Sequence, residues 1–407
     1  MKNFKITLII FFLTQFSQSQ QQVSFSIQAH QDDWQLFMSS NIINDLSNNT
    51  KVVFITLTAG DAGIIGNEPT PFYKARENGS VYSSKFAQDL FAEPNPVPIP
   101  YSLTQISYTN NTNLVISHNI ARYEYKNCVN YFFRLPDGNI TGNGFSLTGN
   151  RSLQKLKLNQ ISFLSAIDGS TTFFSWDDLT STIKQIILNE SGNDNQVWIN
   201  TSSINLAPVA SNYNPNDHSD HRYTSIAARD AVSNLSWVGI AGWVNYHSAN
   251  RPSNLTNFRH QESTAIFAVA NWGIIESGYD NSFNTGHQQW LPMDYYAIDR
   301  FPVGNKKLNS KIAETTTRVP LVLNYKNPIA LDEEISINVN IFETGNLKIE
   351  VFNLLGQLIN EEVFLIEDVG VNNIVLQKLN LTNKDEICLV KITLNDKYLD
   401  TFKLLFK

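Results

Sequence analysis

The chain has 407 residues, of which 42% are hydrophobic and 16% charged, and a formal net charge of -7 from 37 acidic and 30 basic residues. This length allows two or three domains with well-buried cores. The acidic balance and the absence of a basic stripe argue against nucleic acid as a partner. The only two cysteines, Cys128 and Cys388, exclude a framework of several disulfides. Two unpaired buried thiols are favoured over a bridge between them.

Residues 1–19 have the pattern of a secretory signal peptide. Lys2 and Lys5 precede an apolar stretch over 6–16, and Ser17-Gln18-Ser19 offers a small-x-small cleavage site. The apolar stretch is too short for an ordinary membrane span, although an uncleaved anchor remains the alternative. Since no other segment approaches ~20 apolar residues, we expect no transmembrane span in the mature chain. We expect the protein to be secreted or held on the outer cell surface after export.

The first predicted structural unit is a strand, a turn, a helix and a second strand. Apolar residues alternate over 23–27, recur at helical spacing over 36–46, and form a continuous run over 52–57. Such a unit implies parallel pairing through a right-handed crossover, and therefore an α/β fold. The turn, residues 29–34, then lies at the carboxyl end of the first strand, where open α/β sheets place their ligand sites.

This turn carries His30, Asp32 and Asp33. Imidazole and carboxylate together suit a divalent ion such as zinc. Of two adjacent aspartates, one can bind the metal while the other acts as general base on the metal-bound water. The alternative from the triplet alone is that the two aspartates only cap the following helix.

A second polar cluster favours the metal interpretation. Residues 216–222, Asn-Asp-His-Ser-Asp-His-Arg, follow a strand-like run and a polar loop, and they precede a predicted helix over 223–235. Two of the seven histidines fall here within four residues. His30 and Asp33 with one of these histidines would form a site of two histidines and one carboxylate, with positions left open for water and substrate.

The two motifs together resemble the PIG-L/LmbE family of metal-dependent N-deacetylases. That family carries Ala-His-Pro-Asp-Asp-Glu after its first strand and His-Pro-Asp-His much later. The turn over 58–63, Thr-Ala-Gly-Asp-Ala-Gly, and Ala75-Arg76-Glu77 also resemble family features, so the resemblance covers roughly residues 22–250. It implies a Rossmann-like parallel sheet with helices on both faces, in a deacetylase domain over 20–305.

The resemblance also implies the roles of the site residues. His30, Asp33 and His221 would bind the metal, which is expected to be Zn2+, with another divalent ion such as Fe2+ possible. Asp32 would be the general base for the metal-bound water. His218, when protonated, would stabilise the oxyanion and help the amine to leave.

The remaining predicted roles concern orientation and substrate contact. Asp220 would orient His218. Four residues are predicted to contact the substrate, an N-acetylated amino sugar or glycoconjugate: Arg76, Glu77, Trp34 and His247. For His247, the structural and functional interpretations are equally weighted.

Three positions depart from the family pattern. Gln31 stands in place of Pro, and Trp34 in place of Glu. Asn216 stands where some members have a Tyr that polarises the scissile carbonyl, and Tyr213 or Tyr246 are candidates to replace it.

Residues 93–170 are predicted to be an insertion near the active-site face. Their arginines and tyrosines are candidate sugar or lipid-head contacts, although packing of the insertion's own core is favoured for the aromatic residues. Asp177-Asp178 lies at the start of an amphipathic helix over 175–188 and is interpreted as a solvated helix start, not a second metal site. His118, His260 and His287 are interpreted as structural or exposed.

Residues 306–319 are polar and turn-like and are predicted to be a linker. Short alternating strands follow over 320–407, which indicates a small antiparallel β-sandwich. Three segments of it resemble the type IX secretion sorting domain of Bacteroidota: 324–328, 351–357 and 403–407. The resemblance implies that the type IX secretion machinery is a partner, although Ile387-Cys388-Leu389 stands where the family usually has Gly-x-Tyr.

The sequence thus predicts a secreted, zinc-dependent deacetylase of an N-acetylglucosamine-type sugar. Two alternatives remain open. One is a catalytically inactive carbohydrate-binding protein on the same fold, which the departures at Trp34 and Asn216 favour. The other is an iron-dependent oxygenase, because two histidines and one carboxylate also bind non-haem iron.

Overall fold

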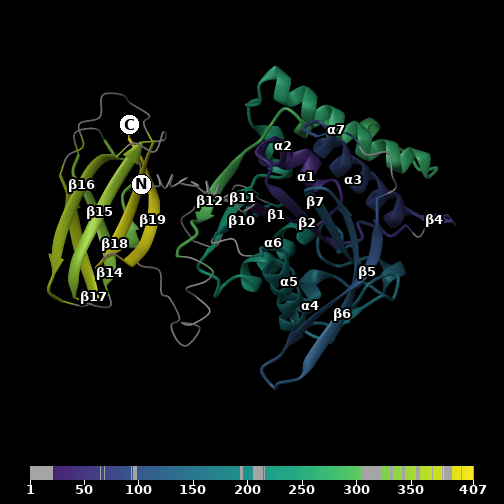
Figure 1. Ribbon diagram of the computed structural model, residues 1–407, viewed down its shortest axis with the longest axis horizontal. Coiled ribbons are helices and arrows are strands. Elements are labelled where there is room, and N and C mark those ends of the chain that lie inside the picture. Colours follow the sequence, from purple (N-terminus) through teal and green to yellow (C-terminus); the bar gives the residue numbers. More distant parts are fainter. Residues whose placement is uncertain are drawn as a thin grey trace, which may run out of the picture.

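The computed structural model (Figure 1) describes two stretches of the chain. The first covers residues 22–304 and 306, except 65, 68, 93, 95–98, 193–195, 205–213 and 215. The second covers 322–406, except 328, 331–332, 342–343, 354–357, 369, 378, 380–386 and 396. The predicted signal peptide and all but one residue of the predicted linker lie outside them. No helix in the described stretches is both long and apolar enough to cross a membrane.

An eight-stranded sheet forms the centre of the first domain, in the order β12-β11-β10-β1-β2-β7-β6-β5. The five inner strands from β11 to β7 are parallel, and β12, β6 and β5 extend the sheet antiparallel at its two edges. The strands are β1 (Val23–Gln28), β2 (Lys51–Thr58), β5 (Tyr101–Thr109), β6 (Val115–Tyr125), β7 (Cys128–Leu135), β10 (Val197–Ser202), β11 (Val238–Trp243) and β12 (Tyr296–Arg300). Two short hairpins lie outside the sheet: β3 (Gly66–Asn67) with β4 (Thr70–Pro71), and β8 (Leu164–Ser165) with β9 (Thr172–Phe173).

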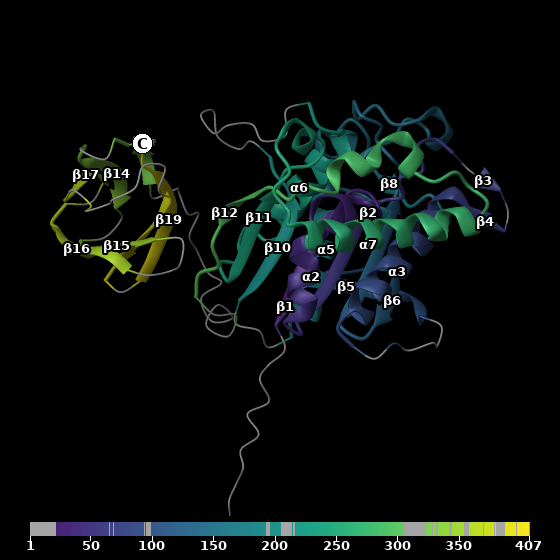
Figure 2. The same cartoon turned by 90° about the horizontal axis from the view of Figure 1, so that it is seen from above.

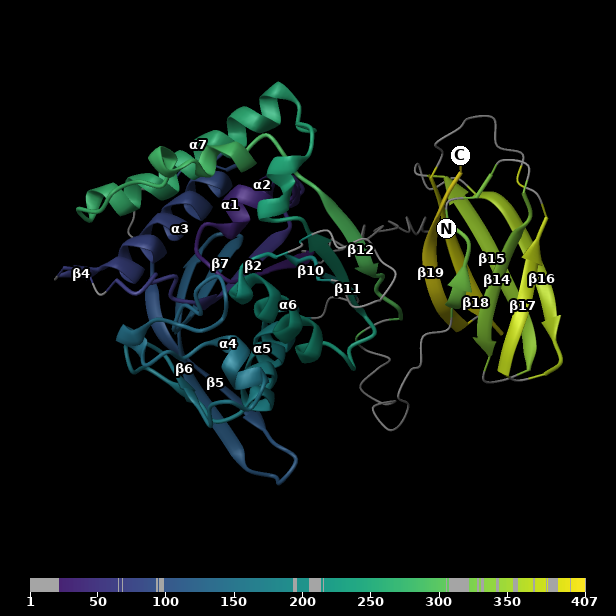
Figure 3. The ribbon, with the colours of Figure 1, turned by 180° about the vertical axis from the view of Figure 1, so that it is seen from behind.

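Helices cover both faces of this sheet, as Figures 1 and 3 show. One face carries α1 (Asp33–Phe37), α2 (Ser39–Ser47), α3 (Phe72–Asp89) and α7 (Asn257–Glu276). The other carries α4 (Leu153–Lys157), α5 (Trp176–Glu190) and α6 (Ser219–Ala231). Short 3-10 turns complete the domain: η1 (Ser146–Thr148), η2 (Tyr246–Asn250), η3 (Phe283–Thr285) and η4 (His287–Trp290).

The two faces have separate hydrophobic cores because the side chains of β2 alternate between them. Val53 and Ile55 pack with α5 and α6, whereas Val52 and Phe54 pack with α2 and α7. Central parallel strands are buried on both sides, which explains why β1 and β2 are apolar over almost their whole length. The predicted fold class, a Rossmann-like parallel sheet with helices on both faces, is confirmed.

The strand order places the polar motifs together. From β1 the chain continues to β2 and then β7 on one side, while β10 and β11 lie on the other side, so the order reverses between β1 and β10. Ligands of open α/β sheets bind at this reversal, beyond the carboxyl ends of the strands. The turn after β1 carries His30 to Asp33, and the loop after β10 leads to His218 at the start of α6.

The segment 93–170 was predicted to be an insertion near the active-site face, but it forms part of the core of the domain. It supplies β7, which pairs in parallel with β2, and the β5–β6 hairpin that extends the sheet. Tyr131, Phe132 and Phe133 are buried, so these aromatic residues pack the core. Arg134 is buried as well, which excludes it as a surface contact for sugar.

The C-terminal stretch is the predicted antiparallel β-sandwich, and Figure 2 shows its two layers. One sheet has the order β13-β14-β17 and the other β16-β15-β18-β19. Its strands are β13 (Val322–Tyr325), β14 (Ile335–Ile341), β15 (Gly345–Asn353), β16 (Leu358–Ile366), β17 (Gly370–Leu376), β18 (Ile387–Leu394) and β19 (Lys397–Leu405). The sandwich has its own hydrophobic core, which includes Cys388. Cys128 is buried in the first domain, and among the described residues no disulfide joins the two cysteines, as predicted.

Candidate metal centre

The turn after β1 fixes His30 and Asp33 through the backbone. Asp33 Oδ2 accepts hydrogen bonds from the N–H groups of Ala29 (3.0 Å) and His30 (2.9 Å). Its other oxygen, Oδ1, is thereby directed to the site. Gln31, at the position of the family's Pro, donates its side-chain amide to the carbonyl of Ala59 (2.8 Å) and so ties this turn to the one after β2.

His221 reaches the same point from the first turn of α6. Its Nδ1 lies 2.9 Å from Asp217 Oδ1, so the carboxylate holds a proton on Nδ1 and leaves the lone pair of Nε2 free for a ligand. Asp217 is itself held by the side-chain amide of Asn245 (3.2 Å). The sequence analysis assigned no role to Asp217, although its spacing of four residues from His221 on a predicted helix start was a usable signal.

The three predicted metal ligands converge. His30 Nδ1 lies 3.2 Å from His221 Nε2 and 3.6 Å from Asp33 Oδ1, and His221 Nε2 lies 3.1 Å from Asp33 Oδ1. Tetrahedral zinc with bonds of 2.0–2.2 Å places its donor atoms about 3.4 Å apart. All three side chains are buried. The donor set and its spacing therefore fit a zinc-sized ion.

The electrostatics of the cluster favour a positive charge. Burial opposes protonation of His30, but Asp33, Asp220 and Asp137 outweigh it and raise its pKa to about 10. Burial likewise opposes protonation of His221, yet Asp217 and Asp33 raise its pKa well above the usual value. Carboxylates that stabilise a buried imidazolium also stabilise a metal cation in its place.

Asp220 was predicted to orient His218, but it does not. Its Oδ2 accepts the N–H of Gly138 (2.8 Å) and lies 3.5 Å from the outer nitrogen of His30, Nε2, but 4.0 Å from His218 Nδ1. It is fully buried, and this burial raises its pKa to about 6. The carboxylate therefore faces a metal ligand and acts through it.

His218 caps α6, and this fixes its tautomer. Its Nδ1 accepts the N–H of Asp220 (3.1 Å), so the proton of the neutral ring is on Nε2, which lies 3.8 Å from Asp137 Oδ1. Burial, together with His30 and His221, lowers the pKa of His218 to about 2. In this structure the ring is therefore a neutral donor, whereas the predicted role of His218 requires the protonated form.

Asp32 lies at the mouth of the site with Arg76. Arg76 Nη2 donates to Asp32 Oδ1 at 2.5 Å, and its Nη1 donates to the carbonyl of Gly60 at 2.6 Å. Gly60 has φ +51°, and an added Cβ would come within 2.2 Å of Arg76 Nη1, so the position requires glycine. The side chain of Asp32 makes no capping hydrogen bond to α1, which removes the interpretation of Asp32 as a helix cap.

A cavity of about 130 Å³ opens onto these groups. Asp137, Tyr246 and His287 line it in addition to predicted residues. Tyr246 stacks on Trp290 with ring centroids 4.8 Å apart, and Trp290 donates its indole N–H to the Tyr246 carbonyl (3.0 Å). The remaining lining residues are His30, Asp32, Asp33, Leu36, Arg76 and His218.

Of the four predicted substrate contacts, the structure brings only Arg76 to this cavity. Trp34 is wholly buried, packs against Phe54 and donates to Ser80 Oγ (3.2 Å), so the prediction for Trp34 is wrong. Glu77 is also wholly buried and binds Arg134, so its prediction is wrong for the same reason. His247 lies on η2 beside Asn250 and does not line the cavity.

Asp137 lines the cavity but was not predicted as a site residue, and His287 was interpreted as structural or exposed. Asp137 follows the carboxyl end of β7, where the rule that located Asp32 also applies. His287 carried no periodic signal, and its place depends on packing between η4 and the rest of the domain. Tyr246, one of the two candidates to replace the family's Tyr, lines the cavity, and burial raises its pKa above the usual value. The other, Tyr213, lies outside the described residues.

Comparison with known proteins finds no matching family model and no matching curated protein. Among solved structures, N,N'-diacetylchitobiose deacetylase from Pyrococcus horikoshii is 13% identical over 66% of this chain and 75% of its own, with a TM-score of 0.36. The zinc-inhibited form of teicoplanin deacetylase Orf2 is 10% identical over 61% of this chain and 83% of its own, with a TM-score of 0.30. Similarities at these scores support no conclusion about the function of this chain. The interpretation of the site therefore depends on its own geometry.

Proposed function

We propose that this chain is a metal-dependent amide hydrolase that removes the acetyl group from an N-acetylglucosamine-type sugar. One observation carries the proposal: His30 Nδ1, Asp33 Oδ1 and His221 Nε2 converge at 3.1–3.6 Å, and the carboxylate of Asp32, which makes no capping bond to α1, lines the same cavity. The order of the motifs, which resembles that of the PIG-L/LmbE deacetylases, supports the choice of substrate class.

The metal ligands, Asp32, Arg76 and His218 each have a chemical task in this reaction. A zinc ion held by the three ligands would polarise the acetyl carbonyl and acidify a water molecule. Asp32 accepts the proton of the attacking water, and Arg76 orients its carboxylate. His218 donates its Nε2–H to the carbonyl oxygen as negative charge develops there. The C–N bond then breaks, the nitrogen takes up the proton that Asp32 accepted from the water, and the products are acetate and the free amine.

The alternative, an inactive carbohydrate-binding protein, was favoured by the departures at Trp34 and Asn216. The structure removes the first of these. Trp34 packs in the core between α1 and α3 and leaves the cavity open. Asn216 remains a departure from the pattern of the PIG-L/LmbE deacetylases, but Tyr246 lines the cavity and is our candidate to replace the Tyr of that pattern. Asp32 and His218 both line the cavity, which supports turnover over binding alone.

We also propose that the protein acts outside the cell. The signal-like segment over 1–19 supports export, and the resemblance of 320–407 to a type IX sorting domain supports transfer across the outer membrane. The antiparallel sandwich with its own core is compatible with such a separate sorting domain. Removal of residues 320–407 should keep the protein inside the outer membrane, and its release into the medium despite this truncation would refute the sorting role.

The test of the catalytic proposal is acetate release. The zinc-loaded chain is offered N-acetylglucosamine oligomers, with Asp32→Ala beside the wild type. We expect release by the wild type and a loss of at least 100-fold in the variant. Release that persists in Asp32→Ala, or that requires oxygen, would refute the mechanism.

A further inference from the structure

A second and larger cavity lies between the β5–β6 hairpin and α5. Its volume is about 830 Å³, within the 300–1,000 Å³ typical of ligand sites. Among the described residues, it shares no lining residue with the cavity at the metal centre. A smaller cavity of about 320 Å³ adjoins it, and both are lined by Phe174 and Ser175. We call the two together the α5 groove.

A buried polar cluster forms the floor of the larger cavity. His118 Nε2 and the hydroxyl of Tyr108 both lie 2.7 Å from Asp178 Oδ1, and His118 Nδ1 lies 2.7 Å from Thr171 Oγ1. Asp178 is thus buried against a histidine, which corrects its interpretation as a solvated helix start. These bonds join the β5–β6 hairpin to α5, so the walls of the cavity are held in a defined position.

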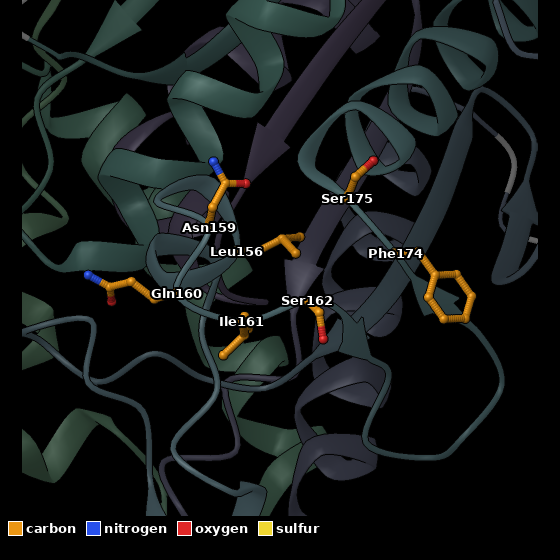
Figure 4. A pocket seen from close by; sticks show the side chains of 7 residues that line it. All are labelled: Leu156, Asn159, Gln160, Ile161, Ser162, Phe174 and Ser175. Atoms are coloured by element: carbon orange, nitrogen blue, oxygen red, sulfur yellow. The ribbon is translucent and has the colours of Figure 1, made fainter.

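The same aspartate holds the aromatic residue at the junction of the two cavities. Asp178 Oδ2 accepts the backbone N–H of Phe174 (2.9 Å), while the Phe174 side chain is 71% exposed. Figure 4 shows its ring on one side of the smaller cavity and the amides of Asn159 and Gln160 on the other, with Leu156 between them. An exposed aromatic face opposite amide groups suits a sugar ring, which has an apolar C–H face and hydroxyl groups at its edge.

The lining of the larger cavity combines polar side chains with apolar ones such as Val115, Ile116 and Leu188, and it has little net charge. Asn110, Asn111, Thr112 and Gln185 offer hydrogen-bonding groups, and Asp177 and Asp178 stand against Lys184. Such a lining does not resemble the apolar core of a protein interface. It fits a neutral, hydroxyl-rich chain better than a peptide or an anion.

The groove and the metal centre lie near one another in the fold. α4 lies between them: Leu156 of α4 lines the groove, and Gln154 of α4 accepts a hydrogen bond from Ser219 Oγ (2.8 Å), the residue after His218. α5 follows β7 and β9 in the chain and precedes β10, so it runs from the carboxyl ends of the parallel strands back to the start of β10. Its N-terminus therefore lies at the edge of the sheet where the metal ligands lie.

We propose that the α5 groove is a secondary carbohydrate-binding site. It would hold a stretch of a neutral N-acetylated oligosaccharide while another sugar of the same chain, or of a neighbouring chain, lies at the metal centre. This inference rests on the proposed function for the substrate class. Tethering of this kind raises the effective concentration of a long substrate without affecting a short one.

The test uses the full chain and the variant Phe174→Ala, with Phe258→Ala as the matched control, because Phe258 is an equally solvent-accessible phenylalanine on α7 (65% exposed). The probes are the dimer and the pentamer of N-acetylglucosamine. We expect Phe174→Ala to raise the KM for the pentamer about tenfold, with the kcat and the KM for the dimer unchanged. Phe258→Ala should change none of these values, and Phe174→Tyr should restore the KM.

A second measurement separates this inference from the proposed function. Titration calorimetry on the chelator-treated chain measures pentamer binding without any turnover. Weaker binding by Phe174→Ala, with Phe258→Ala unchanged, would support the groove even if no acetate is released. Acetate release with the same pentamer affinity and KM in the wild type and Phe174→Ala would overturn the groove and leave the proposed function intact. The absence of pentamer binding to the chelator-treated wild type would also overturn it.

Discussion

His30 Nδ1 and His221 Nε2 face each other at 3.2 Å although 191 positions separate the two residues in the chain. Asp217 accepts a hydrogen bond from Nδ1–H on the far side of the His221 ring, so the nitrogen facing His30 has a lone pair. Two buried imidazoles and the Asp33 carboxylate at such distances stabilise a shared cation. This relationship predicts how the protein responds to metal.

Zinc should stabilise the folded chain, and His221→Ala should abolish this effect. An ion that binds only the folded state raises the free energy of unfolding in proportion to the logarithm of its concentration. The Tm of the wild type should therefore rise with added zinc and fall with a chelator, while His221→Ala shows neither change and carries less than one tenth of the metal. His260→Ala, on α7, is the matched control and should behave as the wild type. Equal metal content in His221→Ala and the wild type would contradict the ligand assignment.

Asp217→Asn should weaken metal binding without removing it. The carboxylate positions His221 and fixes its tautomer, and loss of such an outer partner typically costs 10–100-fold in metal affinity. Competition with a chromophoric chelator measures the Kd directly. At saturating zinc the variant should regain most of its activity, which a residue that touches substrate would not. An unchanged Kd would show that His221 is oriented by other contacts.

Local rules were sufficient to predict that His30 and Asp33 lie near a histidine of the second cluster, whereas the choice of His221 over His218 came from the family resemblance. The apolar run of β1 followed by His30 and Asp33, and the helix start at His221, place all three at the carboxyl ends of neighbouring strands. The same reasoning applied to Asp137 after β7 would have found it. Strand pairing was harder to predict from the sequence. The run 128–135 was assigned to an insertion because its parallel partner, β2, lies some 75 residues earlier and cannot be identified from local periodicity.

Side-chain direction could not be predicted from the motifs. Asp220 lies two residues from His218 and was assigned to it, but the helix start turns its carboxylate toward His30. Arg76 and Glu77 are adjacent on α3 and therefore point in different directions, one to Asp32 and the other to Arg134. Trp34 follows the ligand turn directly, yet α1 turns its side chain into the core. In each case tertiary packing determined the direction of the side chain, and it differed from the direction that sequence proximity suggested.

Glu77→Gln should destabilise the protein and leave substrate affinity unchanged. Glu77 accepts hydrogen bonds from both Nε (2.6 Å) and Nη2 (2.9 Å) of the buried Arg134, which also donates to Asp168. Removing one partner of a buried ion pair costs about 3–5 kcal/mol because the other charge remains buried. Chemical denaturation should show this loss, while the KM of the folded fraction stays at the wild-type value. A raised KM with unchanged stability would instead restore the predicted substrate contact.

Asp294→Asn should stabilise the protein at alkaline pH and not at acidic pH. Burial raises the pKa of Asp294 to about 8, and its Oδ1 has no hydrogen-bond partner among the described residues. An unfolded aspartate has a pKa of about 4, so between pH 4 and 8 the folded state holds a proton that the unfolded state has lost. Stability therefore falls as the pH rises through this window, and asparagine avoids that loss.

The measurement for Asp294 is the Tm of the wild type and the variant at pH 5 and pH 8. The Tm of Asp294→Asn minus that of the wild type should be larger at pH 8 than at pH 5 by a few degrees. Asp280→Asn, at an exposed position near the end of α7, is the control and should show no such pH-dependent difference. An equal Tm difference for Asp294→Asn at both pH values would mean that the carboxyl is ionised in the folded state, and that water or a neighbouring donor stabilises its charge.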